Sequence, residues 1–247
     1  MRLSDFRVLT FDCYGTLIDW EAGITAALQP MLVHAAVQTG APSEPGTLLQ
    51  AFARHEGAVQ DAAPGTLYPE VLAEVHRRLA EEWGAPADAA ADRRFGASVP
   101  DWPAFPDSAE ALQRLKRHYA LVVLSNVDRT SFQASQARLG VAFDAVYTAQ
   151  DIGSYKPDPA NFHYLLDHLA SLGFARHDVL HTAQSLFHDH VPAQRIGLRT
   201  AWIDRRHEHD GQAGARGATQ APEPGVRFDV RFTTLAAMAD AREAEAA

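Results

Sequence analysis

Charged and polar side chains follow the short apolar runs of this sequence, at the places where predicted strands end. Asp12 comes directly after the run 7–11, Lys156 follows the run 143–147, and Asp189 follows the run 179–182. Ligands of an open parallel sheet bind outside the carboxyl ends of its strands. An aspartate carboxylate can act as a nucleophile, and a lysine ammonium can stabilise negative charge. The spacing therefore predicts a small active site in the loops that follow the strands.

The elements that position these residues are indicated by apolar runs that alternate with amphipathic stretches. The runs are short and rich in β-forming residues. They fall at residues 7–11, 119–124, 143–147, 179–182, 200–203 and 228–232, with helix-like stretches at 108–116, 131–139, 161–172 and after residue 189. Such alternation of strand and helix predicts an α/β fold, with a parallel sheet covered by helices on both faces.

One long segment breaks the alternation, because residues 18–96 read as successive helices without a convincing strand. We therefore predict two domains: a Rossmann-like core of residues 1–17 and 97–247, and an inserted helical cap domain of residues 18–96. The Gly-rich and polar stretch 207–225 predicts a mobile surface loop, and the Ala/Glu-rich residues from 236 onward predict a helix.

Composition limits the class of partner. The sequence has 31 acidic and 22 basic residues and a formal charge of −9, which disfavours binding to nucleic acid or to an anionic membrane. A small molecule is the expected partner. The single cysteine, Cys13, cannot form an intramolecular disulfide, and no signal-peptide or membrane-spanning run is recognisable. We expect a cytoplasmic protein.

Three motifs together resemble the haloacid dehalogenase superfamily. They are Phe11-Asp12-Cys13-Tyr14-Gly15-Thr16-Leu17, Leu124-Ser125-Asn126 and Tyr155-Lys156-Pro157-Asp158-Pro159, in the family's order. The resemblance covers the whole predicted core. It implies a Rossmann-like domain in which Asp12 is the nucleophile.

Tyr14 narrows the resemblance. Phosphatase members of the superfamily carry, two places after the nucleophile, an aspartate that protonates the leaving alcohol. A phenol, with a reference pKa of about 10, is a poor acid for that task, whereas a halide leaves without a proton. The chain therefore resembles the L-2-haloacid dehalogenases, which work without a metal or other cofactor, more than the magnesium-dependent phosphatases.

This resemblance implies that Asp12 displaces halide from the 2-carbon of a short 2-haloalkanoic acid. The resulting ester would be hydrolysed to a 2-hydroxy acid of inverted configuration. Lys156 would keep Asp12 ionised and stabilise developing charge, and Thr16 would orient the Asp12 carboxylate. Asp189 would fix Lys156 and help to position the hydrolytic water.

The resemblance also implies the substrate-binding residues. Ser125 and Asn126, with backbone N–H groups at the start of the next helix, would bind the substrate carboxylate, and Tyr14 would line the same pocket. The family uses an arginine of the cap to bind the leaving halide. Arg54 is the best match for that arginine, and a homodimer is expected by the same resemblance.

The fourth motif departs from the family pattern. Gln184 or Ser185 stands where relatives carry an acidic residue or serine, and Asp189 is the one acidic residue there. The missing carboxylate weakens any magnesium site. Phe162 replaces a tyrosine found in some dehalogenases, so substrate choice is expected to differ. His181, His188 and His190 lack the spacing and cysteine partners of a zinc site.

Three alternatives stay open. The same Asp12 chemistry could open a strained ring such as that of azetidine-2-carboxylate. A magnesium-dependent phosphatase is disfavoured by Tyr14 and Gln184. A protein that only binds a small acid or serves assembly would require Asp12 to be chemically idle.

Overall fold

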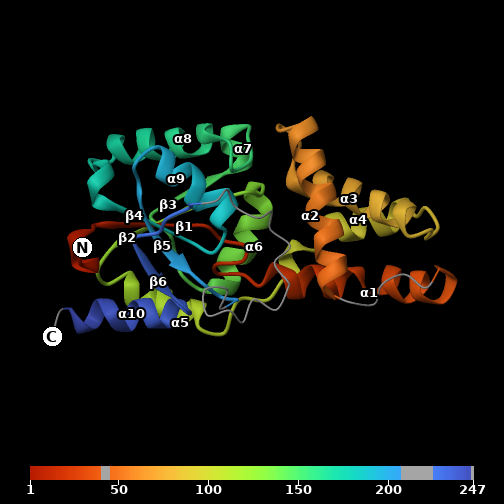
Figure 1. Cartoon of the computed structure of the whole chain (residues 1–247), viewed down its shortest axis with the longest axis horizontal. Helices are drawn as coiled ribbons and strands as arrows, with labels where there is room; N and C mark the ends of the chain where they lie inside the picture. Colours follow the sequence, from red (N-terminus) through yellow and green to blue (C-terminus); the bar gives the residue numbers. More distant parts are fainter. Residues whose placement is uncertain (40–44, 207–224, 246–247) are drawn as a thin grey trace.

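The sheet of the molecule is a single layer of six parallel strands. The structure, a computed structural model, describes residues 1–39, 45–206 and 225–245. The strand order is β3-β2-β1-β4-β5-β6 (Figure 1). The strands are β1 (Val8–Phe11), β2 (Ala120–Ser125), β3 (Ala145–Thr148), β4 (Val179–Ala183), β5 (Arg199–Ile203) and β6 (Val230–Phe232). The predicted α/β class and parallel sheet are confirmed.

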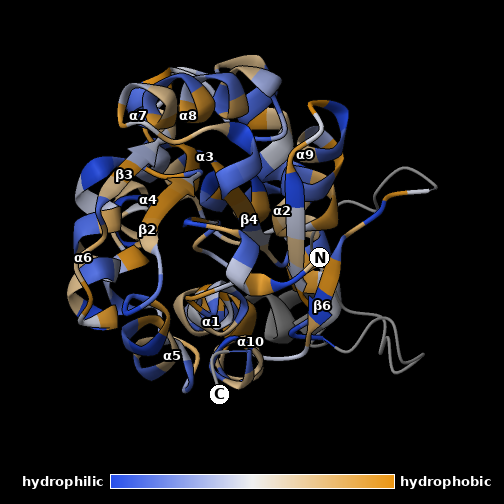
Figure 2. Ribbon diagram, turned by 90° about the vertical axis from the view of Figure 1, so that its left-hand side faces the viewer, coloured by the Kyte–Doolittle hydropathy of each residue, from blue (hydrophilic) through white to orange (hydrophobic). Residues whose placement is uncertain are grey.

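Helices cover both faces because neighbouring strand residues point to opposite sides. Val8 packs with α8 (Pro159–Ser171) and α9 (Val191–Arg195) on one face. Leu9 belongs to the larger core cluster on the other face. That face is covered by α5 (Ser108–Leu115), α6 (Arg129–Leu139) and α10 (Leu235–Ala244), and the short helix α7 (Ala149–Ile152) follows β3. In Figure 2 the helices are mixed in hydropathy along their length, whereas β2 is largely hydrophobic.

The register of the central strands brings their carboxyl ends to one edge. Phe11, the last residue of β1, lies opposite Val123 of β2 and Thr182 of β4. Strand β1 therefore has later strands on both sides, which is the position where the strand order reverses. Such a switch point is where ligands bind in open α/β sheets, and the residue that follows β1 is Asp12.

Four helices lie between β1 and β2 in the chain: α1 (Trp20–Thr39), α2 (Pro45–Ala62), α3 (Tyr68–Glu82) and α4 (Ala89–Gly96). No strand occurs in the described part of this segment. Close packing joins it to the loop before α5, where Trp102 lies against Gly23 of α1. A hydrogen bond from the Tyr155 hydroxyl to the Thr66 carbonyl, 2.6 Å long, joins it to the sheet layer. The division into a core and a cap domain at residues 17/18 and 96/97 remains a prediction.

Two further expectations concern the ends of the fold. The helix expected from residue 236 onward corresponds to α10. Glu245, which follows α10, accepts hydrogen bonds from the backbone N–H groups of Leu3 and Ser4. The loop expected at residues 207–225 lies, up to residue 224, outside the described residues.

Among the described helices, none combines the length and apolar character needed to cross a membrane.

Candidate active site

Asp12 stands at the carboxyl end of β1 and is 6% exposed. Its backbone N–H donates to Thr182 of β4, which continues the sheet bonding by one residue. The turn that follows is possible because Gly15 adopts a φ of +97°, a conformation that favours glycine. This turn brings the Thr16 hydroxyl within 2.6 Å of Asp12 Oδ2. Thr16 Oγ1 also accepts from the Gln184 N–H at 2.9 Å, so its hydrogen is directed at Asp12.

Lys156 links Asp12, Asp189 and the end of β2. Its ammonium nitrogen Nζ lies 2.9 Å from Asp12 Oδ1, 2.7 Å from Asp189 Oδ1 and 3.0 Å from the carbonyl oxygen of Leu124. An ammonium has three hydrogens to donate, and these acceptors use all of them. The side chain is 1% exposed. Burial alone would lower the pKa of Lys156, but the carboxylates of Asp12 and Asp189 outweigh it and the pKa is raised.

The two carboxylates respond differently to burial. Burial raises the pKa of Asp12, with Lys156 and Thr16 acting in the opposite direction. Burial also acts to raise the pKa of Asp189, but Lys156 and His181 outweigh it and the pKa is lowered. Asp189 is therefore the stronger acid of the pair. Asp12 and Asp189 share the Lys156 ammonium, which acts to lower the pKa of both carboxyl groups.

His181 supports Asp189 from the middle of β4. Its Nε2 lies 2.9 Å from Asp189 Oδ1, and its Nδ1 lies 2.8 Å from the Thr10 hydroxyl of β1. The ring is fully buried. This contact orients Asp189 toward Lys156, whereas Asp189 Oδ2 has no hydrogen-bond partner among the described residues.

Asn126 positions the backbone of Lys156. Its Oδ1 accepts from the Lys156 N–H at 2.7 Å, and its Nδ2 donates to the Lys156 carbonyl at 3.0 Å. Both polar atoms of the Asn126 amide are thus engaged, although the residue also lines the cavity. Ser125 is buried beside it, and its Oγ has no hydrogen-bond partner among the described residues.

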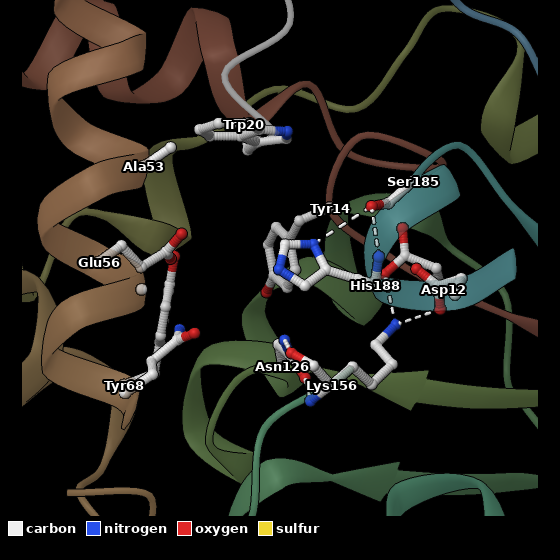
Figure 3. A pocket seen from close by; sticks show the side chains of 13 residues that line it. Asp12, Tyr14, Trp20, Ala53, Glu56, Tyr68, Asn126, Lys156, Ser185 and His188 are labelled. Carbon is white, nitrogen blue, oxygen red and sulfur yellow. Dashed lines mark hydrogen bonds and ion pairs between the residues drawn. The ribbon is translucent and has the colours of Figure 1, made fainter. Parts of the chain in front are cut away.

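A cavity of about 80 Å³ opens in front of Asp12, with room for a few water molecules. The sheet side contributes segments that follow the strands, and the opposite side is formed by α2 and the start of α3 (Figure 3). The described lining residues are Asp12, Tyr14, Trp20, Ala53, Glu56, Gly57, Gln60, Tyr68, Asn126, Lys156, Ser185, His188 and Asp189. The cavity suits a small ligand.

Tyr14 lines this cavity as a neutral phenol. Its hydroxyl is 2.9 Å from Ser135 Oγ, and its ring meets Trp102 edge to face at 5.5 Å. Burial raises the pKa of Tyr14 well above its usual value. The phenol is thus an even weaker acid than its type suggests.

Arg54, expected to bind a leaving halide, is not brought to the cavity. The residues of α2 that line it are Ala53, Glu56, Gly57 and Gln60, which share one helical face. Arg54 points away from that face, and its Nη2 bonds both oxygens of Glu82 at 2.7 and 2.8 Å. Its side chain is 59% exposed. In this structure Arg54 lies on the surface of α2 and forms an ion pair with Glu82 of α3.

Glu56 and His188 are site residues that the sequence reasoning missed. Tyr68 donates to Glu56 Oε1 at 2.8 Å, and burial raises the pKa of Glu56 to about 7. His188 Nδ1 lies 3.2 Å from Ser185 Oγ, and burial lowers the pKa of His188 to about 4. The imidazole is therefore neutral at neutral pH. The helical spacing of Ala53, Glu56 and Gln60 was visible in the sequence, but the direction in which that face points was not.

The described residues do not fit a magnesium ion. Asp12 and Asp189 already share the Lys156 ammonium, and Gln184 contributes no anionic oxygen. Magnesium prefers carboxylates with free positions for water and phosphate. Within the described part of the chain, no group of three His, Cys, Asp or Glu residues is placed to hold a metal ion.

Known proteins resemble this chain at the level of family and fold. A solved structure of the L-2-haloacid dehalogenase PA0810 is 24% identical, with a TM-score of 0.74, and the match covers 98% of this chain and all of that one. The L-2-haloacid dehalogenase from Xanthobacter autotrophicus, solved with chloropropionic acid covalently bound, is 18% identical with a TM-score of 0.74. That match covers 95% of this chain and 97% of the other.

Sequence comparison adds one curated relative and a family. An (S)-2-haloacid dehalogenase 4A from Burkholderia cepacia is 29% identical over 116 residues, which are 46% of this chain and 48% of the relative. The match thus spans about half the length of that relative. The model of the haloacid dehalogenase-like hydrolases matches residues 6–182, from β1 through most of β4. This chain belongs to the haloacid dehalogenase-like hydrolases.

Proposed function

We propose that this protein is a metal-independent hydrolase of the (S)-2-haloacid dehalogenase type, with Asp12 as nucleophile. The observation that carries the proposal is the position of the Asp12 carboxylate. It faces a small cavity and is held by Thr16 at one oxygen and by Lys156 at the other. The neutral phenol of Tyr14 supports a leaving group that departs without a proton.

The first step is a displacement at carbon. A carboxylate oxygen of Asp12 attacks the 2-carbon of the acid from the side opposite to the halogen. The new C–O bond forms as the carbon–halogen bond breaks, and the halogen leaves as halide with the bonding electron pair. The product of this step is an ester of Asp12 with inverted configuration at the 2-carbon.

The second step is hydrolysis at the protein carbonyl. Water attacks the carbonyl carbon of the Asp12 ester, the acyl C–O bond breaks, and the 2-hydroxy acid leaves with an oxygen that came from Asp12. The carboxylate is restored with one water oxygen, and a proton is released. Asp189 Oδ2 supports this step, because it is an acceptor without a protein partner among the described residues and can hold the attacking water.

The Lys156 ammonium stabilises the negative charge that develops on the Asp12 carbonyl oxygen during this hydrolysis. Thr16 fixes the orientation of the carboxylate throughout. Ser125 and Asn126, with backbone N–H groups at the start of the following helix, are proposed to bind the substrate carboxylate. Asn126 lines the cavity, whereas Ser125 is buried behind it. The helical segment that includes α2 and α3 is proposed to act as the cap over this site.

Halide release tests the proposal directly. Purified protein is incubated with (S)-2-chloropropionate and a metal chelator, and chloride is measured for the native protein, Asp12→Asn and Asp101→Asn. Asp101 is an exposed aspartate and serves as the matched control. We expect release by the native protein and the control, and none by Asp12→Asn. No release from folded native protein, or release by Asp12→Asn, would refute the proposal.

A single-turnover experiment tests the ester. With enzyme in excess over substrate in H₂¹⁸O, the first 2-hydroxy acid should contain no ¹⁸O, because its oxygen comes from Asp12. The peptide that contains Asp12 should gain one ¹⁸O. Direct attack of water on the substrate would place ¹⁸O in the first product instead, and mass spectrometry distinguishes the two results.

A second candidate is displacement of a leaving group other than halide from another small 2-substituted carboxylic acid. The cavity favours it, because Lys156 is the one lysine or arginine among the described lining residues and all its hydrogens are engaged. No arginine is among the described residues that line this cavity. Ring opening of azetidine-2-carboxylate, followed by mass spectrometry, would test this candidate with the same Asp12→Asn control.

A further inference from the structure

Glu56 lies on the wall of the cavity opposite the nucleophile. It projects from α2, with Tyr68 beside it, whereas Asp12 and Lys156 lie on the sheet side (Figure 3). The proposed reaction at Asp12 makes no use of this carboxylate. A carboxyl group in a substrate cavity requires a reason, because burial disfavours its charged form.

The charges around the cavity disfavour a negatively charged ligand group next to Glu56, on the α2 side. The described lining residues include three carboxylates, of Asp12, Glu56 and Asp189, and one ammonium, of Lys156. That ammonium is committed to Asp12, Asp189 and the Leu124 carbonyl. Negative charge therefore predominates in this part of the cavity, and a positively charged group is favoured there.

The immediate surroundings of Glu56 fit a cation. Tyr68 donates to Oε1, which leaves Oε2 without a hydrogen-bond partner among the described residues. The rings of Tyr14, Trp20 and Tyr68 also line the cavity. Aromatic faces attract cations, and an ammonium beside a carboxylate and aromatic rings combines an ion pair with a cation–π contact.

We propose that Glu56 binds a positively charged nitrogen of the substrate. The substrate class is then a small 2-substituted carboxylic acid that also carries an amino or ring ammonium group. Its carboxylate lies at the Ser125 and Asn126 side, and its nitrogen lies at the α2 wall. This assignment rests on the proposed function for the site of attack, but the recognition of the cation by Glu56 is tested by binding alone.

A pair of ligands that differ in this one feature provides the test. Azetidine-2-carboxylate has a ring ammonium where cyclobutanecarboxylate has a methylene group, and both have the same ring size and carboxylate. Binding is measured by titration calorimetry on the Asp12→Asn protein, because this substitution prevents turnover. At pH 8 we expect azetidine-2-carboxylate to bind at least about tenfold more tightly than cyclobutanecarboxylate, as expected for one charge-assisted hydrogen bond.

The charge of Glu56 predicts the pH dependence. Its pKa of about 7 in the free protein means that the ionised fraction rises from about one tenth at pH 6 to about nine tenths at pH 8. A secondary amine stays protonated over this range. The affinity for azetidine-2-carboxylate should therefore rise about tenfold from pH 6 to pH 8, with no such rise for cyclobutanecarboxylate.

Two variants identify the group. Glu56→Gln, added to Asp12→Asn, should abolish both the preference for the cation and the pH dependence. Glu70→Gln, a change at an exposed residue of α3, should preserve both. Equal or tighter binding of cyclobutanecarboxylate, absence of azetidine-2-carboxylate binding at pH 8, or an unchanged preference in Glu56→Gln would overturn the proposal. If Glu56→Gln does not fold, the pH dependence with Glu56 intact decides.

The two proposals fail separately. Asp12-dependent chloride release without any preference for the cation would leave the proposed function standing and refute the role of Glu56. A preference for the cation that depends on Glu56, in a protein that releases neither halide nor ring-opened product, would support the role of Glu56 and refute the proposed function.

Discussion

At the scale of single residues, Lys156 holds the site together. It is the one ammonium between two buried carboxylates, and all three of its hydrogens have acceptors. Removing one partner of a buried ion pair leaves an uncompensated charge, which costs more than the pair itself contributes. The stability of the fold and the ionisation of Asp12 therefore depend on the same side chain.

Replacing Lys156 by methionine tests this dependence. We expect Lys156→Met to lower the free energy of unfolding by about 3–5 kcal/mol, measured by urea denaturation at pH 7. Lys116→Met, a change at a partly exposed lysine, should change it by about 0.5 kcal/mol or less. The double variant Lys156→Met/Asp189→Asn should recover part of the loss, because one of the two unpaired carboxylates is gone. Equal stability of the two single variants would contradict the bridging role.

Glu56 should make the fold less stable as the pH rises. Burial raises the pKa of Glu56 to about 7 in the folded protein, against 4.5 for an ordinary glutamate. The folded state therefore binds this proton more tightly than the unfolded state. Stability is lost as the pH rises from about 4.5 to about 7 and the loss is complete above that. Since Glu56 is partly exposed to the cavity, the expected loss is about 1–3 kcal/mol.

The variant Glu56→Gln removes this titration and keeps an acceptor for Tyr68. Its stability relative to the native protein should therefore increase between pH 5 and pH 8, as measured by chemical denaturation at each pH. Glu70→Gln serves as the control. If the free energies of unfolding of Glu56→Gln and the native protein differ by the same amount at every pH in this range, the raised pKa of Glu56 is ruled out.

Much of the site was predictable from residue types, and some of it was not. The position of Asp12 follows from the end of β1, because the carboxyl ends of parallel strands meet at one edge. Thr16, Lys156 and Asp189 lie in longer segments after the strands, and the resemblance to a known family was needed to select them. Arg54 and Glu56 are two residues apart on α2, and which of them faces the cavity depends on how the helix is rotated. That rotation is set by packing across the molecule, which one sequence does not specify.

At the scale of elements, α1 packs through a glycine. A Cβ atom added at Gly23 would lie 2.4 Å from two ring atoms of Trp102, a residue that is 1% exposed. Real atoms cannot approach so closely, so either the ring or the helix would have to move. The indole also donates to Ser98 Oγ at 3.2 Å, which restricts the movement of the ring.

Gly23→Ala should therefore destabilise the protein even though alanine favours helix. The helical preference contributes up to about 1 kcal/mol, whereas overpacking costs typically 1–3 kcal/mol. We expect a lower melting temperature by circular dichroism. Gly65→Ala is the matched control, because a Cβ at Gly65 meets nothing within 4 Å. A melting temperature of Gly23→Ala equal to or above that of the control would contradict the close packing.

The strands and helices of the sheet layer were predictable because their patterns are local. The apolar run 119–124 lies within one residue of β2, and the stretch 161–172 overlaps most of α8. The run 228–232 is less regular, and β6 contains three of its residues, each half-buried. Edge strands bury less apolar surface, and their sequence patterns are correspondingly weaker.

At the scale of the whole molecule, polar contacts join the helical segment to the sheet layer. The hydrogen bond from Tyr155 to the Thr66 carbonyl is one of them. Tyr155→Phe should cost about 0.5–1.5 kcal/mol and accelerate hydrogen exchange around residues 62–67. Tyr164→Phe is the control, since Tyr164 stacks on His168 of its own helix. Unchanged exchange in Tyr155→Phe would show that this contact does not hold the segment.

The expected homodimer is also a prediction at this scale. It follows from the resemblance to the L-2-haloacid dehalogenases. Light scattering at micromolar concentration should give about twice the mass of one chain, 26.9 kDa. A monomeric mass would contradict the expectation.

The complete use of the Lys156 ammonium also determines how the protein can be labelled. The sequence has two lysines, Lys116 and Lys156, and acylating reagents attack the unprotonated, accessible amine. Lys156 is buried and its pKa is raised, whereas Lys116 is partly exposed beside Asp144. Amine-directed dyes should therefore attach to the lysine side chain of Lys116 and spare Lys156. A fluorophore or surface tether could thus be added without blocking the cavity.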